Sequence, residues 1–322
     1  MSLGVVITGA STATRPDGLP APVRSRAARA ERLAQLALAA GAGALAAAGL
    51  ACFDGPPRPD LGVVLGTAFG CFLTNAAYQR RLALTGPAGA SPRLFAATVS
   101  NAAAGELAIA CRLGGPAITL SAGAASGLVA VGQATELLDA GAATAIVAGG
   151  MDAVGEPLEA WARDGGFDAG RPLAEAAAAV VLEPAARAVG RGAPIVGAVR
   201  GAASGFEPDW EAAEAGAGLA AAVRAALAQA GVDAGELALV VSAAPPPLAR
   251  LEQHALAAAG GGLPRRSLAP KVACGETLGA AGVLGVLAAL GALAPRECGL
   301  VLDVCPSGHV AACVVAGPEA AA

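Results

Sequence analysis

Few residues in this sequence could act as a nucleophile or as its base. Ser121 and Ser126 flank Ala124 in the segment "ITLSAGAASGLVAVGQA", where a strand pattern runs into a helix pattern. A serine nucleophile needs a base, and the only histidines of the chain are His254 and His309. The segment "LARLEQHALAAAGG" predicts a helix with a charged face, which favours a surface or helix-end position for His254. His309 is therefore the more interesting candidate base.

The cysteines indicate neither a disulfide framework nor a metal site. The seven are Cys52, Cys71, Cys111, Cys274, Cys298, Cys305 and Cys313. They are odd in number, scattered and without CxxC spacing, which predicts reduced thiols in a cytosolic protein. The two histidines and the dispersed cysteines also lack the spacing of metal ligands. Neither "LGTAFG" nor "SAGAASG" fits the GxGxxG pattern of a dinucleotide site, so we expect no metal and no cofactor.

The composition limits the classes of partner. The chain has 322 residues, with 21 basic and 25 acidic side chains and a formal net charge of -4. This balance provides no field that would hold nucleic acid or an anionic membrane. Hydrophobic residues make up 55% and aromatic residues 3%, with 45 glycines, so the core must consist of small, closely packed side chains.

Residues 33–53 are uncharged and long enough to span a bilayer. Alanine and glycine make this segment weakly apolar, however, no aromatic belt flanks it, and residues 277–294 have the same character. Because both segments lie near strand-like runs, central helices of a layered α/β protein are favoured over membrane spans. The start "MSLGVVITGAS" lacks the pattern of a signal peptide, so a cytoplasmic location is predicted.

Strand-like and helix-like runs alternate in an order that occurs twice. The first half predicts strands at "GVVITG", "LGVVLGT", "AITLS", "AIVAGG" and "AAVVLEP", with helices over 27–50, 101–113 and 126–140. The second predicts strands at "PIVGAVRG", "LALVVSAA", "SLAPKVA", "GLVLDV" and "HVAACVV", with helices over 216–230, 250–260 and 277–293. Both halves read βαβαβαββ, which indicates an α/β protein made by internal duplication, with mostly parallel strands. We expect the halves at 1–190 and 191–322, in one compact unit that shares a layer of apolar helices.

The duplicated pattern resembles the thiolase fold, which implies a five-layer αβαβα arrangement. Several segments are similar to motifs of the β-ketoacyl-acyl carrier protein synthase family, and the resemblance covers nearly the whole chain. "NAAAGELAIACRLGGPAITLSAGAASG" looks like the stretch that leads into the family's nucleophile, and "AIVAGGMDAV" like the strand that follows it. "KVACGETLGAAG" looks like the lysine-histidine motif, and "CPSGHVAACVV" like the closing glycine-rich turn.

The resemblance implies that the family's three main reactive groups are missing. In the family, a cysteine at the amino end of the buried helix and two histidines support acyl transfer and decarboxylation. Here Ala124 stands at the cysteine position, Ala244 in "SAAP" at the first histidine and Glu276 at the second. Three losses in separate loops imply a chain that is naturally unable to condense.

Two acid-base residues of the family pattern are retained. Lys271 is the only lysine of the chain and stands at the family's lysine position. Glu175, in "LAEAAAAVVLE", stands at the acidic position of a glycine-acid-glycine motif whose glycines are alanines here. In the family these groups also form a buried polar network, so a structural role is favoured for both.

The resemblance is strongest to the chain length factor of type II polyketide synthases, the inactive partner of an active ketosynthase. It implies a heterodimer formed through the strand "AITLS", with Thr119 and Ser121 at the interface, and an acyl carrier protein as a further partner, possibly reached through the ketosynthase. It also implies a role in shaping the acyl chain tunnel, for which Phe72, Asn75 and Gln79 fall at helical spacing. Chain length factors carry insertions that this chain lacks, and in this respect the chain resembles the compact partner subunits of aryl polyene-type systems.

Two alternatives stay open. Thiolases proper use a cysteine in the closing turn as a base, and Cys305 precedes His309 by four residues, so residual thiolase-like acyltransferase activity is one alternative. The other is a homodimeric scaffold that binds acyl carrier protein.

Overall fold

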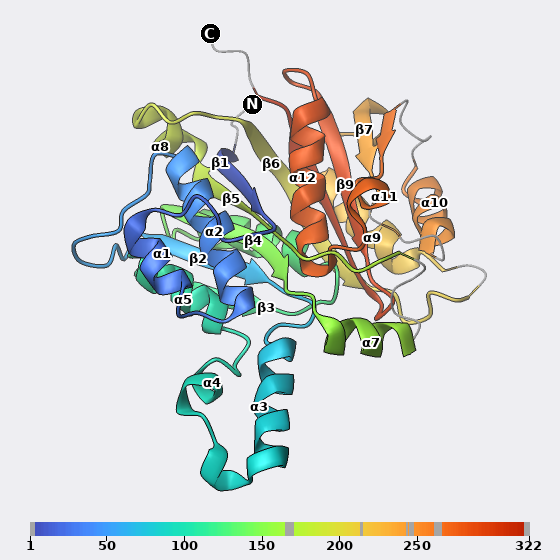
Figure 1. The fold of residues 1–322 in the computed structure, drawn as a ribbon. Coiled ribbons are helices and arrows are strands. Elements are labelled where there is room, and N and C mark those ends of the chain that lie inside the picture. Colours follow the sequence, from blue (N-terminus) through green and yellow to red (C-terminus); the bar gives the residue numbers. More distant parts are fainter. Residues whose placement is uncertain are drawn as a thin grey trace.

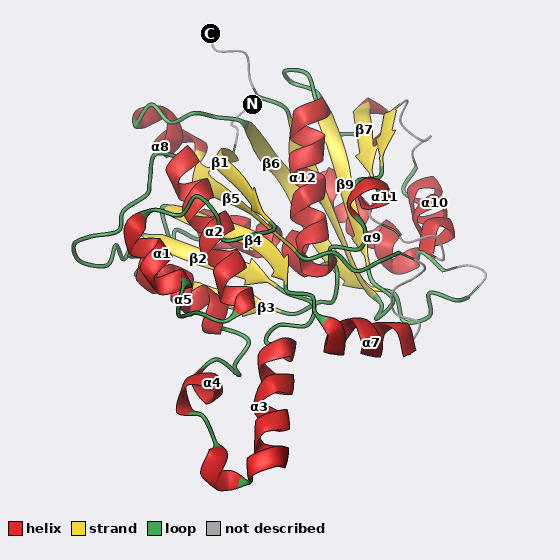
Figure 2. Cartoon of the chain, viewed as in Figure 1, coloured by secondary structure: helices red, strands yellow, loops and turns green. Residues whose placement is uncertain are grey.

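The computed structural model describes residues 4–164, 171–212, 215–242, 244, 248–260 and 266–318. Within these residues ten strands form one sheet, and helices lie on both of its faces (Figure 1, Figure 2). The strands of the first half are β1 (Val5–Ala13), β2 (Leu61–Gly66), β3 (Ala117–Leu120), β4 (Ala145–Asp152) and β5 (Ala176–Pro184). Its helices are α1 (Ala21–Ala27), α2 (Arg32–Ala47), α3 (Phe72–Thr85), α4 (Pro92–Ala96), α5 (Ala102–Ala110), α6 (Ser126–Asp139), α7 (Glu156–Asp164) and α8 (Ala185–Gly190).

The second half repeats this order. Its strands are β6 (Gly197–Phe206), β7 (Leu237–Val241), β8 (Arg266–Leu268), β9 (Cys298–Val304) and β10 (His309–Ala316). Its helices are α9 (Ala217–Ala230), α10 (Ala249–Ala258), α11 (Lys271–Cys274) and α12 (Ala281–Ala292). The spatial order β3-β2-β4-β5-β1-β6-β10-β9-β7-β8 is symmetric about the β1–β6 pair, so the predicted duplication is confirmed.

The helices complete the five predicted layers. Helices α2 and α5 pack on the outer face of the first half, α9 and α10 on that of the second, and α6 and α12 lie between the halves. The two halves of the sheet are joined only by the three residue pairs of β1 and β6. The central helices α6 and α12 pack between these halves. Successive residues of a strand point to opposite layers: Val63 and Leu65 join the outer core, whereas Val64 joins the central one.

The prediction of mostly parallel strands is wrong. Strand β2 is parallel to β3 and β4, and β7 is parallel to β8 and β9, but the other five pairs are antiparallel. A parallel pair requires a crossover, usually a helix, between its strands. Strands β9 and β10 are joined by the short turn 305–308, which reverses the chain.

Two local predictions also need correction. The strand expected at "SLAPKVA" covers only Arg266–Leu268, and residues 271–274 form α11 instead. Pro270 lacks a backbone donor for a sheet ladder and precedes the first turn of that helix. Helices α4, α7 and α8 were not predicted, and α3 and α4 project from the body of the molecule (Figure 1).

The membrane question has a direct structural answer. None of the helices in the described part of the chain has the length and apolar character needed to cross a membrane. The uncharged segment 33–53 ends as a helix at Ala47, and this helix is buried against β1, β4 and β5. It belongs to the outer layer with α5, so the prediction of a central helix is wrong for this segment.

The central layer depends on glycines where backbones touch. A Cβ on Gly150 would lie 1.9 Å from the carbonyl oxygen of Gly279, and one on Gly127 would lie 2.3 Å from it. No side chain fits at such distances, so glycine is required at both positions. The single turn Leu278–Ala280 is thereby held against the end of β4 and the first turn of α6.

Candidate functional site

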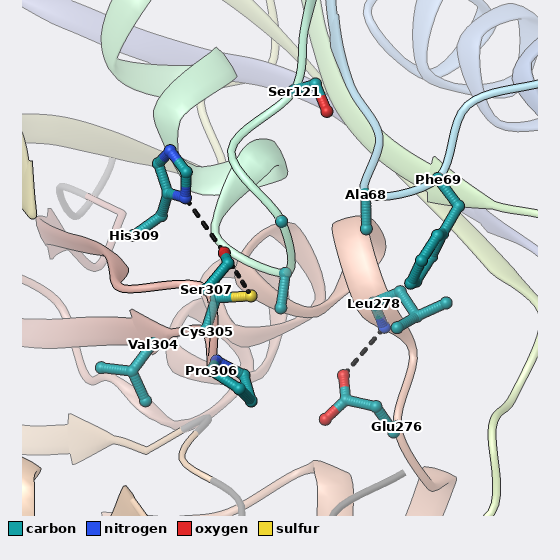
Figure 3. Close-up of a pocket in the computed structure, with 12 residues that line it drawn as sticks. Ala68, Phe69, Ser121, Glu276, Leu278, Val304, Cys305, Pro306, Ser307 and His309 are labelled. Carbon is teal, nitrogen blue, oxygen red and sulfur yellow. Dashed lines mark hydrogen bonds between the residues drawn. The ribbon is translucent and has the colours of Figure 1, made fainter. Parts of the chain in front are cut away.

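A cavity of about 230 Å³ opens where four chain segments meet (Figure 3). These segments are the turns that follow β2, β3 and β9, and the loop before the 278–280 turn. The cavity is lined by Ala68, Phe69, Ser121, Gly123, Ala124, Glu276, Leu278, Val304, Cys305, Pro306, Ser307 and His309. The sequence analysis had singled out five of these residues, from segments far apart in the chain.

The elbow between β3 and α6 forms one wall and carries Ala124, as predicted. Gly123 has a φ of 57°, which lets the chain bend sharply before the helix. Ser126 is completely buried, and its Oγ accepts from Ala122 N at 2.8 Å and lies 3.0 Å from Thr67 O. This hydroxyl therefore holds the elbow against the turn after β2, while Ser121 reaches the cavity.

The turn after β9 lies against this elbow and carries a chain of three polar side chains. The Ser307 hydroxyl lies 3.1 Å from Cys305 Sγ and 3.0 Å from His309 Nδ1 (Figure 3). The sequence had paired Cys305 with His309 directly, but the structure places Ser307 between them. Cys305, Ser307 and His309 are every second residue of the turn, and this spacing is the sequence signal that could have identified Ser307. His254 lies elsewhere, on α10, with Nδ1 3.3 Å from Ala215 O.

A buried charge cluster lies at the second-half side of the cavity. Lys271 Nζ is 2.8 Å from Glu276 Oε1 and 3.8 Å from Asp303 Oδ1, and each of the three residues is at most 5% exposed. Glu276 Oε1 also accepts the backbone N–H of Leu278 at 2.9 Å. The Asp303 carboxyl has no hydrogen-bond partner within the described residues. Sequence analysis found Lys271 and Glu276 but missed Asp303.

The charges of this cluster are set by burial and by mutual attraction. Burial raises the pKa of Asp303 to about 8, against the lowering effect of Lys271. Burial would lower the pKa of Lys271, but the carboxylates of Asp303 and Glu276 outweigh it and raise that pKa. The carboxylates therefore favour a charged Lys271, and burial makes Asp303 keep its proton to a higher pH than an exposed carboxyl does.

A second buried carboxylate, Asp152, fixes the first-half side of the cavity. Asp152 at the end of β4 accepts backbone N–H groups of Ala68, Phe69 and Gly279 at 2.8 to 2.9 Å, and the hydroxyl of Thr67 at 2.8 Å. Burial raises its pKa to about 6 despite these four donors. Asp152 thus ties the turn after β2 to the 278–280 turn. Sequence analysis missed it, because its partners lie 83 to 127 residues away.

The comparisons with known proteins agree with this architecture. A model of the beta-ketoacyl synthase N-terminal domain matches residues 15–188, more than half of the chain. The chain belongs to the beta-ketoacyl synthase family. Among solved structures, the ishigamide ketosynthase/chain length factor is 28% identical with a TM-score of 0.81, over 98% of this chain and 100% of that one. No curated protein matches the chain by sequence.

More distant structures of the family share the fold. A beta-ketoacyl synthase from Burkholderia phymatum is 21% identical with a TM-score of 0.80, over 99% of this chain and 100% of that one. A chain of a type II polyketide synthase ketosynthase complex with its acyl-carrier protein is 19% identical with a TM-score of 0.81, over 98% and 100% of the two chains. These likenesses confirm the thiolase-like fold predicted from the duplication.

The two acid-base residues retained from the family pattern lie in different networks. Glu175 Oε1 pairs with Arg32, 2.8 Å from its Nε, and Oε2 accepts Val154 N at 3.3 Å. Lys271 contacts Glu276 and Asp303 instead. The expectation of a shared buried network for Lys271 and Glu175 is therefore not met in the contacts of the described residues, because Arg32 of α2 occupies the glutamate.

The remaining predicted site residues do not line the cavity. Ala244 is buried, and its N–H donates to Glu252 at 3.1 Å. Phe72 begins α3 and packs against Phe69 and Trp161, with ring centroids 6.3 and 6.5 Å away. The tunnel candidates behave differently from one another. Asn75 donates to Cys71 Sγ at 3.2 Å, whereas Gln79 is exposed on the projecting part of α3.

Thr119 lies in β3, which is the outermost strand at one end of the sheet. Its Oγ1 is buried and has no hydrogen-bond partner in the described part of the chain. Among the described residues, one edge of β3 has no neighbouring strand, and backbone groups along such an edge can pair with another chain.

Proposed function

We propose that this chain is a non-catalytic, cytoplasmic ketosynthase-like subunit, a chain length factor, that pairs with an active ketosynthase and shapes its acyl chain tunnel. The observation that carries the proposal is the elbow: the cavity is retained, but Ala124 stands where the resemblance places the nucleophile. A methyl group cannot form an acyl-enzyme intermediate. A subunit of this kind acts through contact with a sister chain.

The free edge of β3 supports a dimer. An antiparallel copy of the same strand from a related chain would continue the sheet across an approximate twofold axis. Thr119 Oγ1, buried and without a partner in the described residues, lies on this strand. The predicted interface residues Thr119 and Ser121 are thus next to the open edge, and Ser121 also reaches the cavity.

The segment from α3 to α5 carries four exposed apolar side chains. Leu84, Phe95, Val99 and Ile109 are 75%, 62%, 52% and 55% exposed. These four residues belong to consecutive helices and their connections. An apolar surface of this kind marks a protein interface. We define these four residues as the apolar projection.

The aromatic cluster links that projection to the cavity. Phe69 lines the cavity and stacks edge-on against Trp161 at 5.4 Å and Phe72 at 6.3 Å. Phe72 begins α3, the helix that carries Leu84 of the apolar projection. A tunnel that runs from the partner subunit along α3 would end at these rings, so Phe72 is the residue we assign to chain length.

The proposal is also supported by the likeness to the ishigamide ketosynthase/chain length factor, at 28% identity over 98% of the chain. The structure of a type II polyketide synthase ketosynthase with its acyl-carrier protein shares the fold. On this basis we propose an acyl carrier protein as the third component, reached through the ketosynthase.

Co-expression with an intact ketosynthase from the same gene neighbourhood tests the proposal. We expect a one-to-one complex on size-exclusion chromatography, and a ketosynthase that is insoluble or inactive unless this chain is present. Phe95→Asp and Leu84→Asp should each abolish the complex. Val189→Asp on α8, a residue 67% exposed outside the apolar projection, is the matched control and should leave it intact.

Two outcomes would contradict the proposal. Condensation of an acyl and a malonyl thioester by the purified chain alone would show that it is a complete ketosynthase. A stable homodimer that ignores the ketosynthase and binds acyl carrier protein would favour the scaffold alternative.

A further inference from the structure

The proposed function leaves one cluster without a role, the chain Cys305, Ser307 and His309 on the cavity wall. We propose that Cys305 is an acyl-accepting thiol, which takes an acyl group from a small thioester and holds it in the cavity. This inference goes beyond the proposed function, since a structural partner needs no reactive thiol. No carbon–carbon bond is formed in this step.

The thiol is placed directly against the elbow. A Cβ on Gly123 would lie 2.3 Å from Cys305 Sγ and 2.9 Å from Ser307 Oγ, so only a glycine leaves room for both groups. Gly123 and Ala124 precede α6, a helix of 14 residues, whose amino end therefore faces the sulfur. The partial positive charge at that end favours an anion such as a thiolate or an oxyanion.

The three side chains form a route for one proton. The distances of 3.1 Å from Ser307 Oγ to Cys305 Sγ and 3.0 Å from Ser307 Oγ to His309 Nδ1 allow two arrangements. In one, the thiol donates to Ser307 and Ser307 donates to a neutral imidazole. In the other, the imidazolium donates to Ser307 and Ser307 donates to a thiolate. Passage between them moves the thiol proton to His309.

The acyl transfer balances without a further reactant. The Cys305 sulfur attacks the carbonyl carbon of the donor thioester, and its proton moves through Ser307 to His309. A new sulfur–carbon bond forms, the sulfur–carbon bond of the donor breaks, and the departing thiolate receives the proton from His309. The product is an S-acyl cysteine and a free thiol.

The lining of the cavity defines the class of acyl group. Phe69, Leu278, Val304 and Ala124 are apolar, and the volume is about 230 Å³. Glu276 is the only carboxylate among the lining residues, and it already pairs with Lys271. A short, uncharged aliphatic acyl group fits these walls, whereas an acyl group that bears its own carboxylate would meet Glu276.

The test is acylation of the full chain, alone or in its complex, by the butanoyl thioester of N-acetylcysteamine. Intact-mass and peptide mass spectrometry should find one butanoyl group, on Cys305. Cys305→Ala should lose it, and Cys274→Ser, which removes an exposed thiol, should keep it. Ser307→Ala and His309→Gln should slow acylation roughly 100-fold at pH 7 and much less at pH 9, because hydroxide replaces the base.

Three results would overturn the inference: no adduct on the wild-type chain, an adduct on Cys274 instead of Cys305, or equal rates in Ser307→Ala and the wild type at pH 7. In parallel, we measure whether the wild-type chain and Cys305→Ala each restore a soluble, active ketosynthase. If the wild-type chain restores the ketosynthase but is not acylated, only this inference is rejected. If it is acylated but does not restore the ketosynthase, only the proposed function is rejected.

Discussion

Asp152 and Asp303 are two carboxylates of the same type and the same complete burial, on the two sides of one cavity. Asp152 accepts four hydrogen bonds, three of them from backbone N–H groups. Asp303 accepts none from the described residues and has Lys271 at 3.8 Å. Hydrogen bonds from the protein stabilise the carboxylate of Asp152. The carboxyl group of Asp303 has instead a nearby cation, Lys271, and a raised pKa.

This difference separates a structural role from a chemical one. The four donors of Asp152 belong to turns that form the cavity walls, so its charge holds the walls in place. Asp303 holds no segment by hydrogen bonds, and its environment instead fixes how many protons the Lys271 cluster carries. The former is expected to control stability, and the latter the pH at which the cluster changes charge.

The largest expected effect is that of Asp152→Ala. The change leaves three backbone N–H groups and the Thr67 hydroxyl buried without an acceptor, which should cost about 4 kcal/mol or more of the free energy of unfolding. Urea denaturation measures it. Asp139→Asn, on an exposed carboxylate of α6, is the control and should change stability by less than about 0.5 kcal/mol. Equal losses of unfolding free energy in the two variants would contradict a special structural role for Asp152.

Lys271→Met should have the next largest effect, a loss of about 3 kcal/mol of the free energy of unfolding at pH 8. The change leaves Glu276 and Asp303 buried without their cation. At pH 6 the loss should be smaller, because Asp303, with its raised pKa, is then protonated and needs no cation. Thermal or urea unfolding at the two pH values checks this, with the exposed Arg15→Met as control. A loss that does not depend on pH would argue against the buried cluster.

The pH dependence of stability should show the two carboxylates in sequence. Both pKa values are raised above the usual value near 3.9, so the folded chain binds these protons more tightly than the unfolded chain. Their stabilising contribution is complete below about pH 4 and is lost as the pH rises through about 6 for Asp152 and about 8 for Asp303. Between pH 6 and 8 the free energy of unfolding should fall by roughly 2 kcal/mol.

The smallest effect is expected for Asp303→Asn. The amide keeps the shape of a protonated carboxyl, so stability at pH 6 should stay within about 1 kcal/mol of the wild type. Because no proton is then bound at this site, the fall between pH 6 and 8 should flatten. Urea titrations at several pH values measure both features, and an unchanged slope would assign the pH dependence to other groups.

The sequence predicted the layers better than the site. Small, apolar helices such as α6 and α12 and the repeated strand order are visible locally, because their burial on all sides requires such residues. The antiparallel pairs are set by connections and by the meeting of the two halves, which no local pattern reports. The projecting helix α4 has five residues, none of them buried, so no apolar periodicity marks it as an element of the fold.

Within the site, the elbow and the Lys271–Glu276 pair were found because their segments resemble family motifs. Asp152, Asp303 and Ser307 were missed, since each gains its meaning from a partner brought close by tertiary structure. Glu175 shows the converse: its motif suggested the lysine network, and its contact is Arg32.

The apolar projection has a consequence for the cell that makes this protein. A copy without a companion would display these side chains to water and to every other unpaired copy. Under the proposed pairing, surplus molecules would self-associate or be degraded unless the two chains are made at matched rates.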